Sequence, residues 1–145
     1  MVQRLSYEFR RTGCGFRRTE HTEPKNSLAL AHIGDAVFEV LVRLTVLTDG
    51  NAPVNKLHKK ARAIVNAKAQ AEMYYRIQDI LTEEEADVFR RGRNAKSFTV
   101  PKNADLMDYR HATGLEALFG YLYLKGEKER VVELFKLGMA EKLEK

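Results

Sequence analysis

The segment SLALAHIGDAVFEVLVRLTVL, residues 27–47, constrains the fold more than any other part of the chain. Its apolar residues recur at three- and four-residue steps, the spacing that places side chains on shared faces of an α-helix. Asn26 or Ser27 can cap the first turn, and the glycine and proline of TDGNAP, residues 48–53, end the pattern. The segment therefore predicts a long helix that is apolar on several sides and lies inside the fold.

The rest of the chain repeats the helical pattern almost throughout. We expect helices over about 54–66, 83–91, 105–124 (or from Tyr109) and 128–145, the first continuing with little break through AKAQAEMYYRIQDIL. Thr82 and Glu85 have the spacing of a capping box, and Gly92 follows the arginines of the last turn as a stop. No alternating run is long enough for a sheet, so the sequence predicts an all-α fold.

Two regions differ in composition. Residues 1–26 hold six cations, three acids and no periodic apolar pattern. We expect a flexible basic arm there, since three glutamates argue against a mitochondrial transit peptide. Residues 27–145 are long enough for one domain with a hydrophobic core. The sequence shows no signal peptide or membrane span, and a single cysteine, Cys14, favours a reducing cytoplasm.

The cations of this domain are segregated from its acids. Five lie between Asn55 and Ala71 and five more between Val88 and Ala104, with no acid in either stretch, although the net charge is only +5. Two such clusters predict a cationic face for a polyanion, with a solvated basic surface as the alternative. The second cluster overlaps GRNAKSFTVPKNA, residues 92–104, the longest loop expected in the domain.

Two carboxylates lie within the two most apolar segments. Asp35 follows Gly34 in the first helix, and Glu116 lies in ATGLEALFGYLYL, residues 112–124. Burying a carboxylate is costly unless it is paired, hydrogen-bonded or bound to metal, and we expect Asp35 to be at least partly buried. One explanation is a structural partner for each acid, a remote arginine or, for Asp35, a helix N-terminus. The other is a divalent cation between them, for which oxygen-only ligands favour Mg²⁺ or Mn²⁺.

Several blocks of the sequence resemble the ribonuclease III family. LAHIGDAVFE is similar to its signature helix, and GLEALFGYLYL to the later helix that carries its final glutamate. NKLHKKARAIVNAKAQA, LTEEEADVFRRGRNAKS and VPKNADLMDYRHATGLEALFGYLYL resemble the Mini-III branch, compact relatives without an appended double-stranded-RNA-binding domain. The resemblance covers about residues 27–140, with the blocks in the same order.

This resemblance implies a helical homodimeric endonuclease that cuts double-stranded RNA with Mg²⁺, for which Mn²⁺ substitutes. It implies catalysis and metal binding by Asp35 and Glu116, and products with 5′-phosphate and 3′-hydroxyl ends. The implied substrate is a stem of precursor 23S ribosomal RNA in the cytoplasm, with a ribosomal protein as a candidate assistant. Further family acids correspond to Leu28, Ala31 and Thr113 here, which leaves the number of metal ions open.

Duplex RNA hides its base edges in a deep, narrow groove, so we expect recognition mainly through phosphates and 2′-hydroxyls. The candidate RNA-binding residues are Lys56, Lys59, Lys60 and Lys68 on helices, and Arg91, Arg93, Asn94, Lys96, Ser97, Lys102 and Asn103 around the long loop. We expect the loop to enter a groove of the duplex. Arg90 and Arg91 can instead pair with the acids of residues 83–87.

Two functional alternatives stay open. The first is a non-catalytic double-stranded-RNA-binding or ribosome-assembly module on the same fold, which would keep the basic faces without needing both carboxylates. The second, a helical DNA-binding regulator, lacks a recognition-helix motif. Val37 and Phe38, beside Asp35, are our candidates for a subunit interface.

Overall fold

The computed structural model describes residues 26–96 and 100–143, which form helices and connections without any β-strand. The elements are α2 (Ser27–Thr48), α3 (Val54–Ile64), α4 (Ala67–Ile77), the short 3-10 helix η1 (Gln78–Ile80), α5 (Glu83–Asn94), α6 (Leu106–Leu124) and α7 (Lys128–Leu143). The all-α prediction is confirmed. The expected basic arm lies outside the described residues, apart from Asn26.

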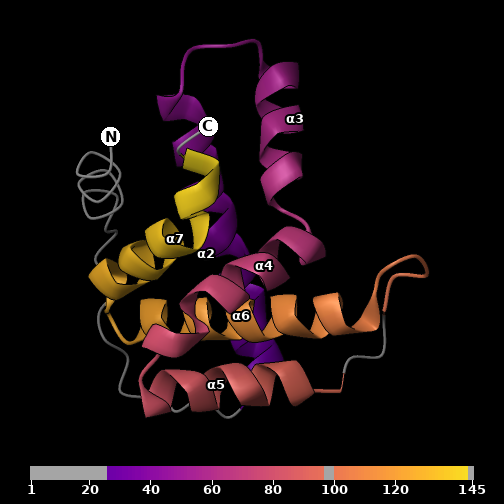
Figure 1. The fold of residues 1–145 in the computed structure, drawn as a ribbon, viewed down its shortest axis with the longest axis vertical. Coiled ribbons are helices and arrows are strands. Elements are labelled where there is room, and N and C mark those ends of the chain that lie inside the picture. Colours follow the sequence, from indigo (N-terminus) through magenta and orange to yellow (C-terminus); the bar gives the residue numbers. More distant parts are fainter. Residues whose placement is uncertain (1–25, 97–99, 144–145) are drawn as a thin grey trace.

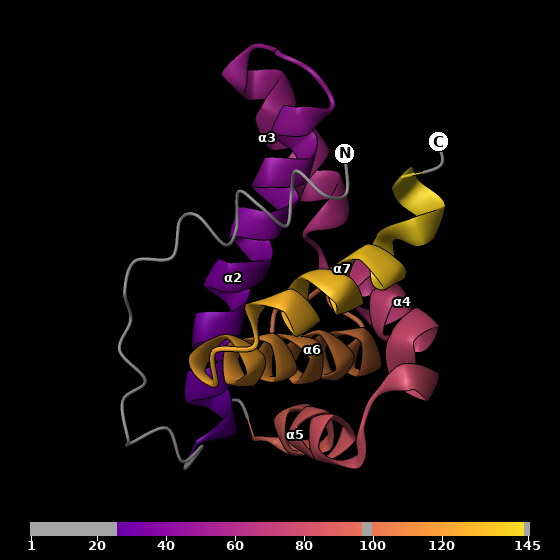
Figure 2. The same cartoon turned by 90° about the vertical axis from the view of Figure 1, so that its left-hand side faces the viewer.

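Helix α6 lies at the centre of the domain and packs against α2, α4, α5 and α7. In Figures 1 and 2, α5 lies on one side of α6 and α7 on the other, while α2 crosses it. Phe38, Leu115, Phe119 and Phe135 are almost completely buried between these helices. Helix α3 stands out from this body beside the C-terminal half of α2 (Figure 1).

Side-chain caps begin the helices of this core. Asn26 Oδ1 accepts from the backbone N–H of Leu28 at 3.0 Å, at the start of α2. The predicted capping box is present at α5: the Thr82 N–H donates to Glu85 Oε1 at 2.9 Å, and the Glu85 N–H donates to Thr82 Oγ1 at 3.2 Å. The Asp105 side chain caps α6 by accepting from the backbone N–H groups of Met107 and Asp108. The starts of α2, α5 and α6 are therefore fixed by signals in the sequence of each helix.

The expected continuation of residues 54–66 into the next helix with little break is confirmed, since only two residues interrupt it. The backbone turns at Val65 and Asn66, which separate α3 from α4. Asn66 bonds to both helices: its Oδ1 accepts from the Ala69 N–H at 2.8 Å, and its Nδ2 donates to the Ala63 carbonyl at 3.1 Å. As a result α4 packs onto α6, while α3 stays beside α2.

Gly92 does not stop α5, which continues to Asn94. A β-carbon added at Gly92 would lie 2.7 Å from the Ala117 β-carbon and 3.1 Å from the Gly114 α-carbon. The glycine is therefore needed for the close contact of α5 with α6. Sequence reasoning mistook a packing glycine for a terminating one.

Val37 and Phe38 are wrong as candidates for a subunit interface, because both are buried inside this chain. The Phe38 ring lies 5.9 Å from that of Phe119 and 5.7 Å from that of Phe135, measured between centroids. The large apolar side chains that α2 does expose are Val40 and Leu47. Across the described residues, every helix is too short or too polar to cross a bilayer.

Candidate functional site

The candidate site is built where α2 crosses α6 in direct backbone contact. A β-carbon added to Gly34 would lie 1.6 Å from the carbonyl oxygen of Glu116, and one added to Gly120 would lie 2.0 Å from that of Leu30. Any side chain at either glycine would separate the helices. The crossing therefore places Asp35, the residue after Gly34, next to the turn of α6 that carries Glu116.

Asp35 and Glu116 occupy different environments at this crossing. Asp35 is exposed, so the expectation that it is partly buried is wrong, whereas Glu116 is largely covered. Burial raises the pKa of Glu116 from 4.5 to about 7, the hydrogen bond from Gln70 opposes the rise, and the charge of Asp35 adds to it. The two acids are thus close enough to repel each other, although they are far apart in the sequence.

Gln70 is a polar residue of the site that sequence reasoning missed. It lies in the first turn of α4 with only 4% of its surface exposed, and its Nε2 donates to Glu116 Oε1 at 3.1 Å. A glutamine carries no catalytic signal by itself. The one available clue was its position among alanines in AKAQA, where a buried amide needs a partner.

Asp35 and Glu116 suit a divalent cation better than an arginine. Within the described residues, no Lys or Arg forms an ion pair with either acid, and no cluster of three or more His, Cys, Asp or Glu side chains is arranged for metal binding. Two neighbouring carboxylates repel each other when both are ionised, and a divalent cation removes that penalty. Their oxygen-only donors fit Mg²⁺ or Mn²⁺, with water completing the coordination.

The predicted RNA-binding residues lie on two surfaces. Lys56, Lys59 and Lys60 are exposed along α3, and Lys68 is exposed in the first turn of α4, two residues before Gln70. The second surface surrounds the end of α5 and the following loop, and it holds the exposed Arg91, Asn94, Lys96, Lys102 and Asn103 and the half-buried Arg93. Ser97 lies outside the described residues. Whether these residues touch RNA stays a prediction.

The alternative for Arg90 and Arg91 is confirmed as a contact. Both guanidinium groups pair with Asp87, Arg91 Nε donating to Asp87 Oδ2 at 2.8 Å. Arg93 Nε donates to Asn94 Oδ1 at 3.2 Å. Exposed pairs of this kind are weak, so the charges stay accessible to a polyanion. Arg90, Arg91 and Lys96 also line a hollow between the start of α2 and the end of α5.

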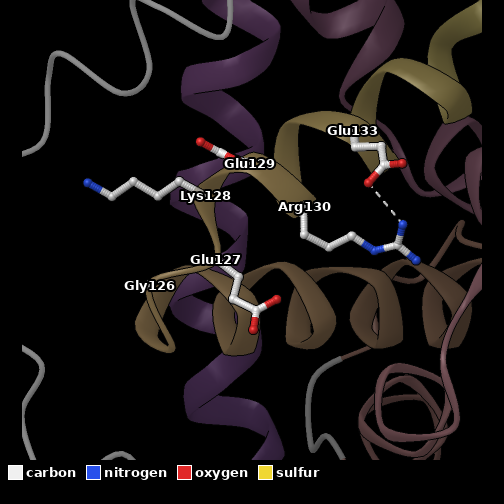
Figure 3. Close-up of a pocket in the computed structure, with 6 residues that line it drawn as sticks. All are labelled: Gly126, Glu127, Lys128, Glu129, Arg130 and Glu133. Carbon is white, nitrogen blue, oxygen red and sulfur yellow. Dashed lines mark hydrogen bonds and ion pairs between the residues drawn. The ribbon is translucent and has the colours of Figure 1, made fainter.

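A different hollow lies at the turn between α6 and α7 (Figure 3). Glu127, Glu129 and Glu133 surround it together with Lys128 and Arg130. Arg130 Nη1 donates to Glu133 at 3.0 Å, so one of its two cations is already paired with an acid that lines it. This hollow contains neither Asp35 nor Glu116, and its acids disfavour a phosphate.

Comparison with known proteins adds an independent line of evidence. Residues 28–127 match the family described as "Ribonuclease III domain". The chain is 53% identical to the Mini-ribonuclease 3 of Thermoanaerobacter sp. (strain X514), over 77% of this chain and 79% of the relative. It is 49% identical to that of Brevibacillus brevis, over 79% and 86%, and 40% identical to that of Staphylococcus aureus, over 81% and 90%.

A solved structure has the same fold. The crystal structure of protein FN1578 from Fusobacterium nucleatum matches with a TM-score of 0.77 and 32% sequence identity. The match covers 87% of this chain and 97% of that one.

Proposed function

The chain belongs to the ribonuclease III family and is an endoribonuclease, and we propose that it cleaves double-stranded RNA with Mg²⁺ held by Asp35 and Glu116. The observation that carries this proposal is the crossing at Gly34, where two acids without a cationic partner among the described residues lie together. A divalent cation bound between the two carboxylates would remove the repulsion between their charges.

The two acids have different parts in the proposed reaction. When bound, Mg²⁺ supplies Lewis-acid polarisation of the scissile phosphate and of the attacking water. Asp35 is exposed, so its carboxylate is the one of the two that solvent and substrate can reach directly. Glu116 must lose its proton to serve as a ligand, which its pKa of about 7 allows near neutral pH. The proposed products carry 5′-phosphate and 3′-hydroxyl ends.

The substrate we propose is a duplex stem of precursor 23S ribosomal RNA, cut in the cytoplasm. Support comes from the exposed lysines of α3 and the basic residues around the loop after α5, which suit phosphate contacts on an A-form duplex. A homodimer would place two sites across one duplex and produce staggered cuts. Assistance by a ribosomal protein belongs to the same proposal.

The direct test is cleavage of duplex RNA in Mg²⁺ by the wild type, Asp35→Asn and Glu116→Gln. Glu127→Gln is the matched control, because Glu127 lies at the separate α6–α7 hollow. We expect each site substitution to lower the cleavage rate by more than about 100-fold, with the control unchanged. Cleavage that survives both substitutions would refute the site. Binding by the wild type without cleavage would favour the non-catalytic RNA-binding module.

A further inference from the structure

We propose that Gln70 is a positioning residue for Glu116, holding one carboxylate oxygen so that the other is free for the metal shared with Asp35. This inference rests on the proposed function of the two acids. It concerns a residue of α4, a helix that contributes no acid to the site.

The hydrogen-bond partner of Gln70 sets it apart from the other buried polar side chains. Among the described residues these are Thr45, Gln70, Glu85 and His111. Thr45 donates to the Leu41 carbonyl of its own helix, and His111 Nδ1 bonds the Met107 carbonyl of its own helix. Gln70 instead reaches from α4 to α6 and donates to a carboxylate. Its hydrogen bond therefore fixes a side chain of the site rather than one turn of its own helix.

The chemistry of the donor also suits a metal ligand. Glu85, the other covered glutamate, accepts from Arg130 through two nitrogens, Nε at 2.9 Å and Nη2 at 2.8 Å. That carboxylate is neutralised and has no charge left for a cation. Glu116 accepts instead from a neutral amide, which leaves its negative charge available for a cation. An arginine in the place of Gln70 would compete with the metal.

The backbone around Gln70 is held firmly enough to aim the amide. Asn66 caps α4 through Ala69, and the Gln70 N–H donates to the Asn66 carbonyl at 3.0 Å. Ala71 and Met73 bury the following turn. Lys68, two residues before Gln70, is exposed in the same turn. The capped first turn of α4 therefore holds the Gln70 amide in place for Glu116, while Lys68, two residues earlier, faces another direction.

The test measures Mn²⁺ affinity of the whole chain by isothermal titration calorimetry, in the absence of RNA. The variants are Gln70→Met, which keeps the volume, and Gln70→Asn, which keeps the amide but shortens its reach. Gln78→Met is the matched control, because Gln78 is exposed and donates to the Tyr75 carbonyl within its own segment, away from the site. We expect both Gln70 variants to bind Mn²⁺ about 10- to 100-fold more weakly, with the control unchanged.

Two further measurements separate positioning from general structure. Duplex RNA affinity in EDTA should be the same for the wild type and the Gln70 variants, and kcat should fall in Mg²⁺ and recover in part at raised Mn²⁺. Thermal unfolding checks that each variant folds. If Gln70→Met does not fold, Gln70→Asn serves as the test variant. Equal losses of Mn²⁺ affinity in Gln78→Met and the Gln70 variants would overturn the inference.

The outcomes also distinguish this inference from the proposed function. If Asp35→Asn and Glu116→Gln bind Mn²⁺ as tightly as the wild type, the metal site itself is wrong. If those two lose Mn²⁺ while both Gln70 variants stay within about twofold of the wild type, only the role of Gln70 is overturned.

Discussion

The backbone of Gly34 touches the backbone of Glu116, leaving no room for even a methyl group between α2 and α6. This contact connects stability and chemistry, since the residues that pack the crossing are neighbours of the proposed ligands. Replacing Gly34 by alanine should force the helices apart, because the new β-carbon would lie 1.6 Å from a carbonyl oxygen. We expect a loss of about 3 kcal/mol or more in the free energy of unfolding, measured in urea.

The control for that prediction is Ala36→Ser, an exposed position on the same helix. It should change stability by less than about 0.5 kcal/mol. If the Gly34→Ala variant has the same urea midpoint of unfolding as the wild type, the two helices are not in the close contact that we describe.

The pKa of Glu116 predicts an unusual pH dependence of stability without metal. The carboxyl has a pKa of about 7 in the folded chain against 4.5 ordinarily, so between these values the folded state binds more protons than the unfolded state. The Glu116 contribution to stability is therefore fully present below pH 4.5 and is lost as pH rises to about 7. The loss amounts to about 3 kcal/mol at most.

Urea unfolding at several pH values in EDTA measures this loss. Glu116→Gln should remove it, because an amide does not titrate. If the difference in stability between wild type and Glu116→Gln is the same at pH 5 and pH 7.5, burial does not affect Glu116 as we describe.

Divalent metal should reverse the same effect. Mn²⁺ binds the ionised carboxylate, so it should raise the melting temperature more at pH 7.5 than at pH 5.5, and binding near pH 6 should release a proton. Calorimetry in two buffers with different ionisation enthalpies measures the proton. Asp35→Asn should lose the metal-induced rise, and an undiminished rise in that variant would place the metal elsewhere.

Much of the fold was predictable because its signals are local. Short stretches of sequence predict the caps at Asn26 and Thr82 and the apolar spacing of α2. The structure confirms all three. Gly92 was misjudged because a glycine that terminates a helix and one that packs against a neighbouring helix look the same in one dimension.

The site was predictable only in part, for a related reason. Two acids in apolar segments are an anomaly that sequence reveals, but Asp35 proved to be exposed, although Gly34 beside it is buried against α6. Gln70 was missed, since its place among alanines is a weak clue and its importance comes from a hydrogen bond between two helices that no periodicity encodes.

The Glu85–Arg130 ion pair should affect the stability of the fold but not metal binding at the site. Arg130 joins α7 to α5 through Glu85 and also donates to the Ile80 carbonyl at 2.8 Å. Arg130→Met leaves a buried carboxylate without its cation, so we expect a loss of about 3–5 kcal/mol in the free energy of unfolding. Adding Glu85→Gln should restore part of this loss, and Mn²⁺ affinity of the folded double variant should equal that of the wild type. A lower affinity would mean that this pair also shapes the metal site.

The lysines of α3 give the last prediction. Lys56, Lys59 and Lys60 are exposed on a helix that projects from the body of the domain (Figure 1). Each phosphate contact releases about one counterion, so the logarithm of duplex affinity should fall linearly with the logarithm of salt concentration. Replacing Lys59 and Lys60 by alanine should lower that slope by about two, measured by fluorescence anisotropy in EDTA.

Lys128→Ala is the control for the lysines of α3, because Lys128 lies at the acidic α6–α7 hollow (Figure 3). This substitution should leave the slope unchanged. Equal slopes for the wild type and the double variant would move the RNA away from α3 and onto the basic surface around the end of α5.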